Sequence, residues 1–315
     1  MSVLTELDLR ATVAERIEEA DGIVSVVLTP PAGSRLPEWA PGAHVDLELP
    51  GGLVRQYSLS GDPADGSGYT ITVLDEPGGR GGSRAVHDLS LGSTVRLRGV
   101  RNHFVLTEEP SYVFVAGGIG ITPLRPMIEE VERLGLPWEL HYAGRSRASM
   151  AFVDRLVAEH PSRVAVYARD EGGSLDLAAV VAASSGAALY CCGPGRMIDA
   201  AETLCRNAGR ELHLERFAAG DGVEVFSADD QPFEVHLAQS GITIVVEPGQ
   251  TILDVAEAAG ADVFGSCLEG ICGTCETRVL DGVPDHRDSV LNGEETGTMM
   301  ICVSRAACPR LTLDA

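Results

Sequence analysis

Four cysteines near the C-terminus have the spacing of a metal centre. Cys267, Cys272 and Cys275 form a C-x4-C-x2-C run, and Cys302 follows within M-M-I-C-V. This is the spacing of a plant-type [2Fe–2S] cluster, in which four thiolates hold two irons. Because such a cluster moves single electrons, the chain is predicted to be an electron carrier.

Zinc is the rival metal for the same thiols. Structural zinc sites more often show paired C-x2-C knuckles, and only one such pair is present here. Gly270 and Gly273 lie between the ligands, where a backbone that wraps an inorganic core must turn tightly. The sequence therefore favours iron and sulfide over zinc.

The composition of the chain limits the classes of function. Of its 315 residues, 44% are hydrophobic and 22% charged, as in a folded protein of two or three domains. No apolar run reaches the ~18 residues of a membrane span, and the N-terminus lacks a secretory pattern. We expect a cytoplasmic protein with reduced thiols. A net charge of −22 argues against nucleic acid and anionic membranes as partners.

The first 107 residues are predicted to form an antiparallel β-barrel. Short alternating runs, separated by Gly and Pro turns, are typical of such a fold. The runs are Val24–Leu28, Val45–Leu49, Tyr69–Leu74 and Val95–Arg98.

Residues 108–222 show a different pattern, in which strand-like and helix-like runs alternate. This alternation predicts an α/β domain with a parallel sheet. The first run, Tyr112–Ala116, is continuously apolar, as expected of a strand buried on both faces. Strands are expected again at residues 138–142, 164–167 and 187–192, and helices at 124–134, 149–159 and near 176–183.

Residues 223–230 are small and acidic and predict a linker. Residues 231–315, which carry the four cysteines of the predicted cluster, are predicted to form a further domain. Within it, a hairpin is expected from Phe233–Leu237 and Ile242–Val246, and a short helix between Thr251 and Gly260.

Three further motifs occur in a fixed order. They are Arg55-Gln56-Tyr57-Ser58-Leu59-Ser60, Gly117-Gly118-Ile119-Gly120-Ile121-Thr122-Pro123, and Cys192-Gly193-Pro194-Gly195-Arg196-Met197. The glycine-rich segment directly follows the buried strand, where glycines let the backbone approach a pyrophosphate and a helix N-terminus favours negative charge. Its spacing is not G-x-G-x-x-G, so a plain structural turn is the alternative.

Together these motifs resemble the ferredoxin reductase superfamily. With the cysteine-rich tail, the chain resembles the phthalate dioxygenase reductase family, which includes vanillate demethylase reductases. The resemblance covers nearly the whole chain. It implies a flavin-binding barrel, a nicotinamide-binding α/β domain and a C-terminal α+β ferredoxin domain of the β-grasp type, in that order.

The resemblance also implies a flavin site. Arg55, Tyr57, Ser58 and Leu59 match its flavin motif, with Tyr57 expected against the isoalloxazine and Arg55 near the phosphate or ring edge. A G-R-G-G-S loop stands here as Gly79–Ser83, with Arg80, Gly81, Gly82 and Ser83 as expected contacts. Backbone N–H groups, a hydroxyl and a guanidinium suit a terminal phosphate dianion. This favours FMN over FAD.

The nicotinamide site is implied in the same way. Gly117, Gly118, Gly120 and Thr122 match its glycine loop, and Cys192, Gly193 and Pro194 match its C-G-P segment. Cys192 is expected to shape the hydride-transfer pocket, with Thr122 beside it, while Cys191 should point to the opposite face of the strand. Phe217 either stacks on the flavin or belongs to the core.

The choice between NADH and NADPH rests on two strand ends. Arg145 follows the second strand of the α/β domain and could bind a 2′-phosphate, as could Arg147. Asp170 follows the third strand, and a carboxylate there disfavours that phosphate. The family favours NADH, and NADPH is the lesser alternative. His44 matches a family position, and we expect it to be structural.

Electron counting gives the predicted function. A nicotinamide donates two electrons as a hydride and a [2Fe–2S] cluster accepts one, so a flavin must convert between them. The family points to a terminal oxygenase as acceptor, of the Rieske type that hydroxylates or demethylates aromatic compounds, docked transiently with electrostatic help. The alternatives are a cytochrome P450 or another acceptor, and a redox-sensing module without turnover. The role of Cys308 is left open.

Overall fold

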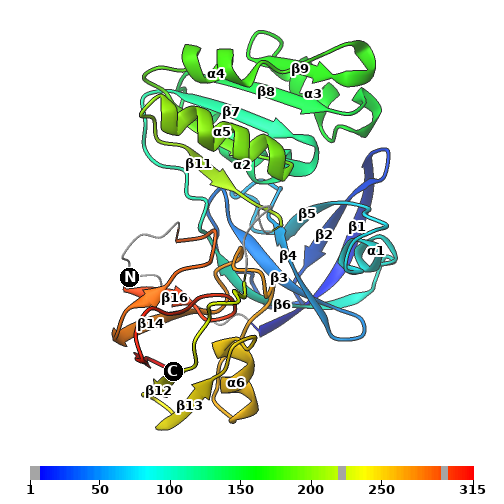
Figure 1. Ribbon diagram of the computed structural model, residues 1–315. Coiled ribbons are helices and arrows are strands. Elements are labelled where there is room, and N and C mark those ends of the chain that lie inside the picture. The colour runs from blue at the N-terminus through cyan, green and yellow to red at the C-terminus, as the bar shows by residue number, and fades with distance from the viewer. Residues whose placement is uncertain (1–7, 219–224, 292–296) are drawn as a thin grey trace. The chain divides into compact units, whose positions relative to one another are not determined.

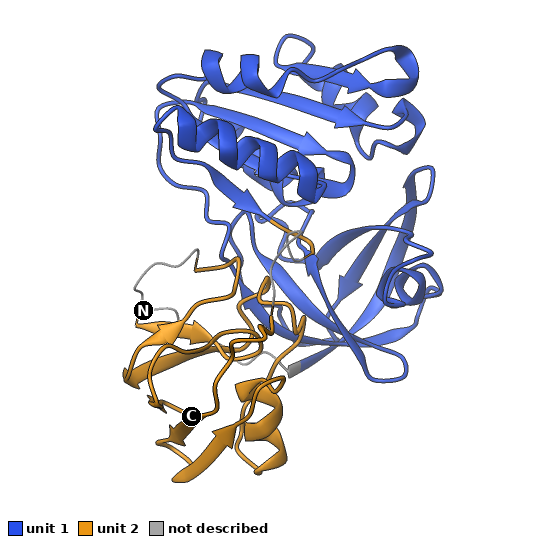
Figure 2. Ribbon diagram, viewed as in Figure 1, with its two compact units in different colours: residues 1–215 blue, residues 216–315 orange. Residues whose placement is uncertain are grey.

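The computed structural model describes residues 8–218, 225–291 and 297–315. The chain forms two compact units, residues 1–215 and 216–315 (Figure 2). The predicted barrel and α/β domains therefore share one unit, and the second unit begins at Arg216. Across the described ranges, no helix has both the length and the apolar character needed to span a bilayer.

The barrel contains six antiparallel strands and one short helix (Figure 1). They are β1 (Asp8–Ala20), β2 (Ile23–Thr29), β3 (His44–Leu49), β4 (Leu53–Ser58), β5 (Tyr69–Leu74), α1 (Gly82–His87) and β6 (Thr94–Arg101). The sheet order is β4-β3-β6-β1-β2-β5. A bridge between Leu59, just after β4, and Ile71 of β5 joins the two edges. This closure confirms the predicted barrel.

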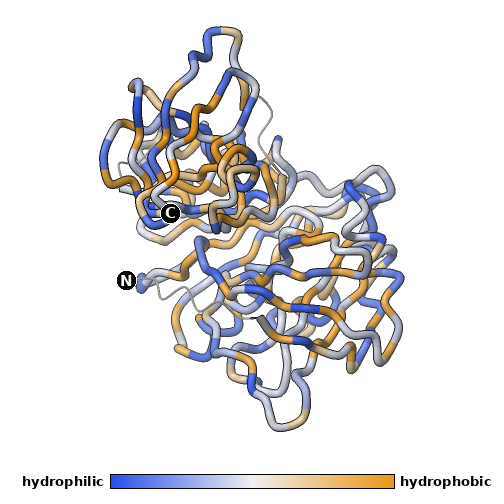
Figure 3. Tube along the Cα trace, turned by 90° about the horizontal axis from the view of Figure 1, so that it is seen from below, coloured by the Kyte–Doolittle hydropathy of each residue, from blue (hydrophilic) through white to orange (hydrophobic). Residues whose placement is uncertain are grey.

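Alternating side chains fill the barrel. Leu47, Ile71 and Leu97 have no exposed surface, and Figure 3 shows hydrophobic and hydrophilic residues alternating along the chain. Arg101 reaches into this region and donates to the fully buried Asp46 carboxylate at 2.7 Å. A buried carboxylate is stable only with such a partner.

The α/β domain is built on a five-stranded parallel sheet of order β11-β10-β7-β8-β9. Its elements are β7 (Tyr112–Gly117), α2 (Ile121–Arg133), β8 (Trp138–Gly144), α3 (Val153–Glu159), β9 (Val164–Ala168), α4 (Leu177–Ala183), β10 (Ala188–Cys192), α5 (Gly195–Asn207) and β11 (His213–Glu215). Three single 3-10 turns lie at Gly118–Gly120, Arg147–Ser149 and Arg169–Glu171. The buried strand β7 is confirmed, whereas α5 had not been predicted.

The strand order reverses between β7 and β10, so the topological switch point lies between them. In open α/β sheets, ligands bind beyond the carboxyl ends of the strands at this point. The glycine-rich loop follows β7 and the Cys192–Met197 segment follows β10. The fold therefore brings these two motifs to the place where a dinucleotide is expected.

The second unit contains a five-stranded mixed sheet of order β13-β12-β18-β14-β16 and a two-stranded ribbon, β15-β17. Its elements are β12 (Phe233–Leu237), β13 (Ile242–Val246), α6 (Ile252–Ala258), β14 (Glu276–Asp281), β15 (Pro284–Asp285), β16 (Thr298–Met300), β17 (Arg305–Ala306) and β18 (Arg310–Leu313). The predicted hairpin is present. The predicted helix is also present, capped by the Thr251 side chain, which accepts the Asp254 N–H at 3.0 Å.

Candidate functional site

The four cluster cysteines lie together in the second unit. Each is at most 4% exposed. Cys267 is within hydrogen-bonding reach of Cys272 and of Cys302, and Cys275 is within reach of Cys302. Over the described residues, no group of three or more His, Cys, Asp or Glu side chains is placed to hold a single metal ion. The four sulfurs instead form a row of neighbours in the order Cys272, Cys267, Cys302 and Cys275. Four soft thiolates are the donor set that a two-iron cluster takes.

The loop between the ligands is shaped for close wrapping. Gly270 and Gly273 have φ values of 66° and 73°, in the left-handed region that favours glycine. A side chain on Gly270 would lie 2.5 Å from Val303. The Glu269 N–H points at the Cys267 sulfur at 3.3 Å, and hydrogen bonding lowers the pKa of the Cys267 thiol. These residues fit a group that needs thiolates and nearby N–H donors.

The predicted flavin residues come together in the first unit. A side chain on Gly82 would lie 2.5 Å from Arg55 and 3.1 Å from the Tyr57 hydroxyl. Arg55 also donates to the Arg80 carbonyl at 2.8 Å. Burial raises the pKa of Tyr57, and Arg55 opposes this shift. The R-x-Y-S strand and the G-R-G-G-S loop, distant in sequence, therefore form one surface.

Two further flavin-motif residues have structural partners. Leu59 is buried at the barrel seam described above. The Ser83 hydroxyl accepts the Glu76 N–H at 3.0 Å, which ties the loop to the end of β5. Gly81 has φ 83° and precedes α1. Contact of these residues with a cofactor stays a prediction.

The two nicotinamide motifs pack tightly against each other at the switch point. A side chain on Gly120 would lie 2.2 Å from the Cys192 carbonyl oxygen, and one on Gly117 would lie 2.6 Å from Pro194. A side chain on Gly193 would in turn lie 2.9 Å from Gly117. Only glycine fits at these positions, so backbone groups line this edge of the sheet. Gly118, at φ 54°, has open space around it.

Thr122 occupies the first turn of α2. Its side chain is 2% exposed, and its hydroxyl donates to the Ile119 carbonyl at 3.0 Å. This contact fixes the turn that carries the glycines. The position suits a residue that supports the loop, and direct participation in hydride transfer stays a prediction.

A carboxylate that sequence reasoning missed joins this site. Cys192 of β10 is the register partner of Glu215 at the end of β11, and the Ser58 hydroxyl donates to Glu215 at 3.2 Å. The barrel motif and the α/β motif therefore meet through Glu215. No local signal in the sequence marks Glu215, because its pairing with β10 and its contact with Ser58 arise only in the fold.

The electrostatics of this cluster are unusual. Desolvation raises the pKa of the Glu215 carboxyl to about 8, and the Ser58 hydrogen bond opposes the shift. The pKa of the Cys192 thiol is raised well above its usual range by burial and by Glu215. Strongly shifted groups in a ligand-binding position mark functional sites. Cys192 is a neutral thiol here, as expected of a pocket wall rather than a nucleophile.

The neighbouring cysteine faces away, as predicted. Cys192 belongs to the core between the sheet and α2, whereas Cys191 packs with Ile198 and Cys205 on the other face. Only Cys192 can therefore face a ligand held by the glycine loop.

The residues predicted to read the adenosine ribose also meet. The Asp170 N–H donates to the Arg145 carbonyl at 3.1 Å, and both side chains are exposed at the carboxyl edge of the sheet. Arg147 pairs with Asp154 at 2.8 Å. Arg145 and Asp170, the two residues predicted to contact the adenosine ribose, therefore lie next to each other. Their contact with a nucleotide stays a prediction.

Two aromatic residues complete the predicted set. Phe217 is 41% exposed and belongs to the second unit, just after the boundary at Glu215. The His44 ring is buried, stacks on His103 with ring centroids 6.1 Å apart, and is the register partner of Ser58. The burial of His44 fits the structural role expected for it.

Comparison with known proteins agrees with this arrangement. A family model described as the 2Fe-2S iron-sulfur cluster binding domain matches residues 235–307. The phenoxybenzoate dioxygenase subunit beta of Ectopseudomonas oleovorans is 48% identical over 303 residues, covering 94% of this chain and 93% of that protein. The vanillate O-demethylase oxidoreductase of Pseudomonas sp. (strain HR199 / DSM 7063) is 43% identical, with coverage of 94% and 96%.

Among the similar solved structures, two that each cover 98% of this chain are informative. Phthalate dioxygenase reductase, described as a modular structure for electron transfer from pyridine nucleotides to [2Fe–2S], is 34% identical with a TM-score of 0.70, and 98% of it is covered. An intact type IV self-sufficient cytochrome P450 monooxygenase is 42% identical with a TM-score of 0.89. The chain spans about two fifths of that longer protein, 41% of its length.

Proposed function

Because this chain belongs to the phthalate dioxygenase reductase family of flavin and iron–sulfur oxidoreductases, we propose that it is the NADH-dependent, FMN-containing reductase of a terminal oxygenase. The observation that carries the proposal is the meeting of Ser58, Cys192 and Glu215 at the switch point, in a chain that also gathers four cysteine thiols. When bound, NADH supplies a hydride, FMN takes the electron pair and releases it singly, and the cluster carries one electron.

The residues of the first unit bind and orient the two organic cofactors. Arg55 and the N–H groups of the Gly79–Ser83 loop offer positive charge and donors to a terminal phosphate, which supports FMN over FAD. The glycines after β7 let the backbone approach a pyrophosphate. The exposed Asp170 supports NADH, because a carboxylate there repels a 2′-phosphate.

Ser58 and Glu215 handle a proton beside the hydride-transfer pocket. A carboxyl with a pKa of about 8 is largely protonated at neutral pH. It can therefore donate its proton through the Ser58 hydroxyl and, as the carboxylate that remains, take a proton back. Cys192 fills the wall of the same pocket and excludes water from it.

The acceptor is proposed from the names of the relatives. A dioxygenase subunit and an O-demethylase oxidoreductase support an oxygenase that acts on aromatic compounds. The likeness to the self-sufficient P450 supports a second candidate, in which the acceptor is a cytochrome P450.

An anaerobic titration tests the core of the proposal. NADH should bleach the flavin band and then the iron–sulfur absorbance, and acid release should yield FMN. Release of FAD would refute the flavin assignment, and a cluster that NADH leaves oxidised would refute the electron path. Steady turnover with cytochrome c as acceptor is expected, and its absence would favour the redox-sensing alternative.

The acceptor is tested separately. The purified reductase is mixed with a Rieske-type oxygenase or a cytochrome P450 from the same source, and NADH-driven reduction of each is followed. Faster reduction of the Rieske-type protein is expected. Preference for the P450 would select the second candidate.

A further inference from the structure

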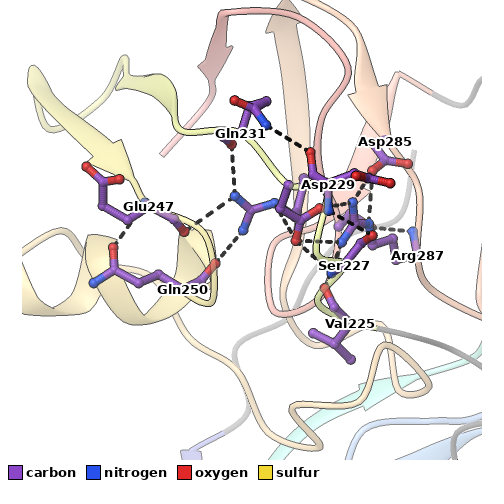
Figure 4. Close-up of polar contacts among 11 residues, drawn as sticks. Val225, Ser227, Asp229, Gln231, Glu247, Gln250, Asp285 and Arg287 are labelled. Atoms are coloured by element: carbon purple, nitrogen blue, oxygen red, sulfur yellow. Dashed lines mark hydrogen bonds and ion pairs between the residues drawn. The ribbon is translucent and has the colours of Figure 1, made fainter.

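A cluster of polar and ionic contacts that includes Arg287 and Asp285 lies in the second unit (Figure 4), and Asp230 is at its centre. The Asp230 side chain is 3% exposed, as is that of Arg305, and Arg287 is 16% exposed. Arg287 Nη2 donates to Asp230 Oδ1 at 2.7 Å, and Arg305 Nε lies 3.4 Å from Asp230 Oδ2. One carboxylate therefore holds two guanidinium groups from different elements.

The cluster fixes the segment that leads into the ferredoxin sheet. Arg287 Nη1 donates to the Val225 carbonyl at 2.9 Å. The Ser227 N–H donates to Asp230 Oδ2 at 3.0 Å, and Arg305 donates to the Gln231 carbonyl at 3.2 Å. Residues 225–231 are thus tied to the rest of the unit at Val225, Asp230 and Gln231, and the Ser227 contact braces the segment internally. Part of this segment had been predicted to be a linker.

The same two arginines are linked to the chain that directly follows Cys302, the fourth predicted cluster ligand. Arg305 begins β17, three residues after Cys302. The Arg287 N–H donates to Ser304 Oγ at 3.2 Å, and Arg305 also donates to the Gln250 carbonyl at 2.7 Å. Arg287 and Arg305 therefore contact both residues 225–231 and the residues that follow Cys302.

The charges keep this arrangement in place. Hydrogen bonding from Arg287 lowers the pKa of Asp230, so its carboxylate stays ionised at neutral pH. Arg287 also pairs with Asp285 at 2.7 Å, so loss of the Asp230 charge leaves chiefly the buried Arg305 guanidinium uncompensated, which is strongly unfavourable. The arrangement should consequently respond sharply to neutralisation of Asp230.

Building on the function proposed above, we propose that Asp230, Arg287 and Arg305 are positioning residues that form a clasp. The clasp binds residues 225–231 to the ferredoxin module and so shortens the connection between the two units. A shorter connection raises the rate at which reduced flavin, losing one electron at a time, reduces the oxidised cluster within the same molecule.

The expected effect follows from chain length. Nine residues lie between Glu215 and Val225, and fifteen lie between Glu215 and Gln231. The effective concentration of two tethered modules falls with about the −3/2 power of the length of the connecting chain. Release of the clasp should therefore slow cluster reduction by roughly twofold.

The test compares Asp230→Asn with Asp229→Asn in the full-length holoprotein. Asp229 is exposed, and its backbone groups alone make the contacts that the structure gives it. Stopped-flow spectroscopy measures flavin reduction by NADH and the later reduction of the cluster. Hydrogen exchange measures the protection of residues 225–231. In D230N we expect faster exchange and slower cluster reduction, with unchanged flavin reduction; D229N should match the wild type.

Several outcomes would overturn the clasp. They are equal exchange in D230N and D229N, or faster exchange with an unchanged rate of cluster reduction. If D230N loses its cluster, the test uses Arg287→Gln in place of D230N. Arg305 still pairs with Asp230 in R287Q, so we expect cluster reduction to be slowed less than by full release of the clasp. An unaltered rate in R287Q contradicts the proposal. A wild-type flavin that NADH fails to reduce would instead refute the proposed function.

Discussion

Ser58 and Glu215 are hydrogen-bonded at 3.2 Å although 157 residues separate them in sequence. One ends the barrel strand β4 and the other ends β11 of the parallel sheet. This contact joins the proposed flavin motif to the strand that pairs with the proposed nicotinamide motif. Desolvation raises the pKa of the Glu215 carboxyl to about 8, and the proton transfer proposed above rests on this pair.

Glu215 should make the protein less stable as pH rises. Its folded-state pKa of about 8 lies above the ordinary 4.5, so the folded state binds more protons than the unfolded state between these values. The free energy of unfolding should fall with increasing pH in this window, by at most about 1.4 kcal/mol per pH unit. Thermal unfolding from pH 5 to 8.5 measures it, and Glu215→Gln should flatten the slope. An equal slope in both proteins would contradict the shift.

Removal of the Ser58 hydroxyl should impair hydride transfer. The hydroxyl opposes the raised pKa of Glu215, so in Ser58→Ala the apparent pKa of flavin reduction should move upward. A rate loss of about tenfold is expected for one lost hydrogen bond of ~1.4 kcal/mol. Stopped-flow pH profiles measure both effects. Ser60→Ala is the control, because its buried hydroxyl pairs with Thr72 instead. Similar profiles in the two variants would place Ser58 outside the reaction.

Gly120 should be far more sensitive to substitution than Gly118. An alanine at 120 would clash with the Cys192 carbonyl oxygen at 2.2 Å, and forced backbone movement should cost about 3 kcal/mol or more. An alanine at 118 meets open space and only the penalty of its φ of 54°, about 1 kcal/mol. Unfolding midpoints of G120A and G118A measure the difference. Equal midpoints would mean that the two loops are not packed as described.

Cys302→Ser should abolish the cluster, whereas Cys308→Ser should retain it. Cys302 is within reach of Cys267 and Cys275. Cys308 instead accepts the Val283 N–H at 3.2 Å and donates to the Arg310 carbonyl at 3.0 Å. Iron and acid-labile sulfide analysis reports the result, and NADH should still reduce the flavin of both variants. Iron loss in C308S with retention in C302S would reverse the ligand assignment.

Electron delivery to the native acceptor should slow with ionic strength. Residues 231–315 carry 13 Asp and Glu against 4 Arg, a formal charge of −9. Such charge accelerates docking to a basic surface and is screened over about 8 Å at physiological salt. Reduction of the acceptor should decline between low and high salt, while NADH reduction of the flavin hardly changes. Insensitivity of both rates would exclude electrostatic docking.

The sequence was sufficient where signals are local. A continuous apolar run predicted β7, and Thr251 with Gly260 marked the ends of α6. Cysteine spacing predicted which four thiols come together, and Cys267, Cys272, Cys275 and Cys302 are neighbours in the structure; their role as cluster ligands stays a prediction. Helix α5 was missed since it follows Pro194 and has no side-chain cap, so the usual start signal is absent.

Contacts between distant residues could not be predicted. Glu215 gains its role only when β11 lies beside β10 and meets Ser58. Asp230 reads as part of an acidic linker until Arg287, 57 residues later, folds onto it. In both cases the chemistry comes from tertiary structure and leaves no local period in the sequence.

The seam of the barrel has a consequence for cofactor loading. The bridge between Leu59 and Ile71 immediately follows the R-x-Y-S strand, so the strand predicted to receive the flavin also closes the barrel. A ligand that binds only the closed form stabilises it by mass action. If the prediction holds, loss of the prosthetic group should loosen the barrel at this edge first.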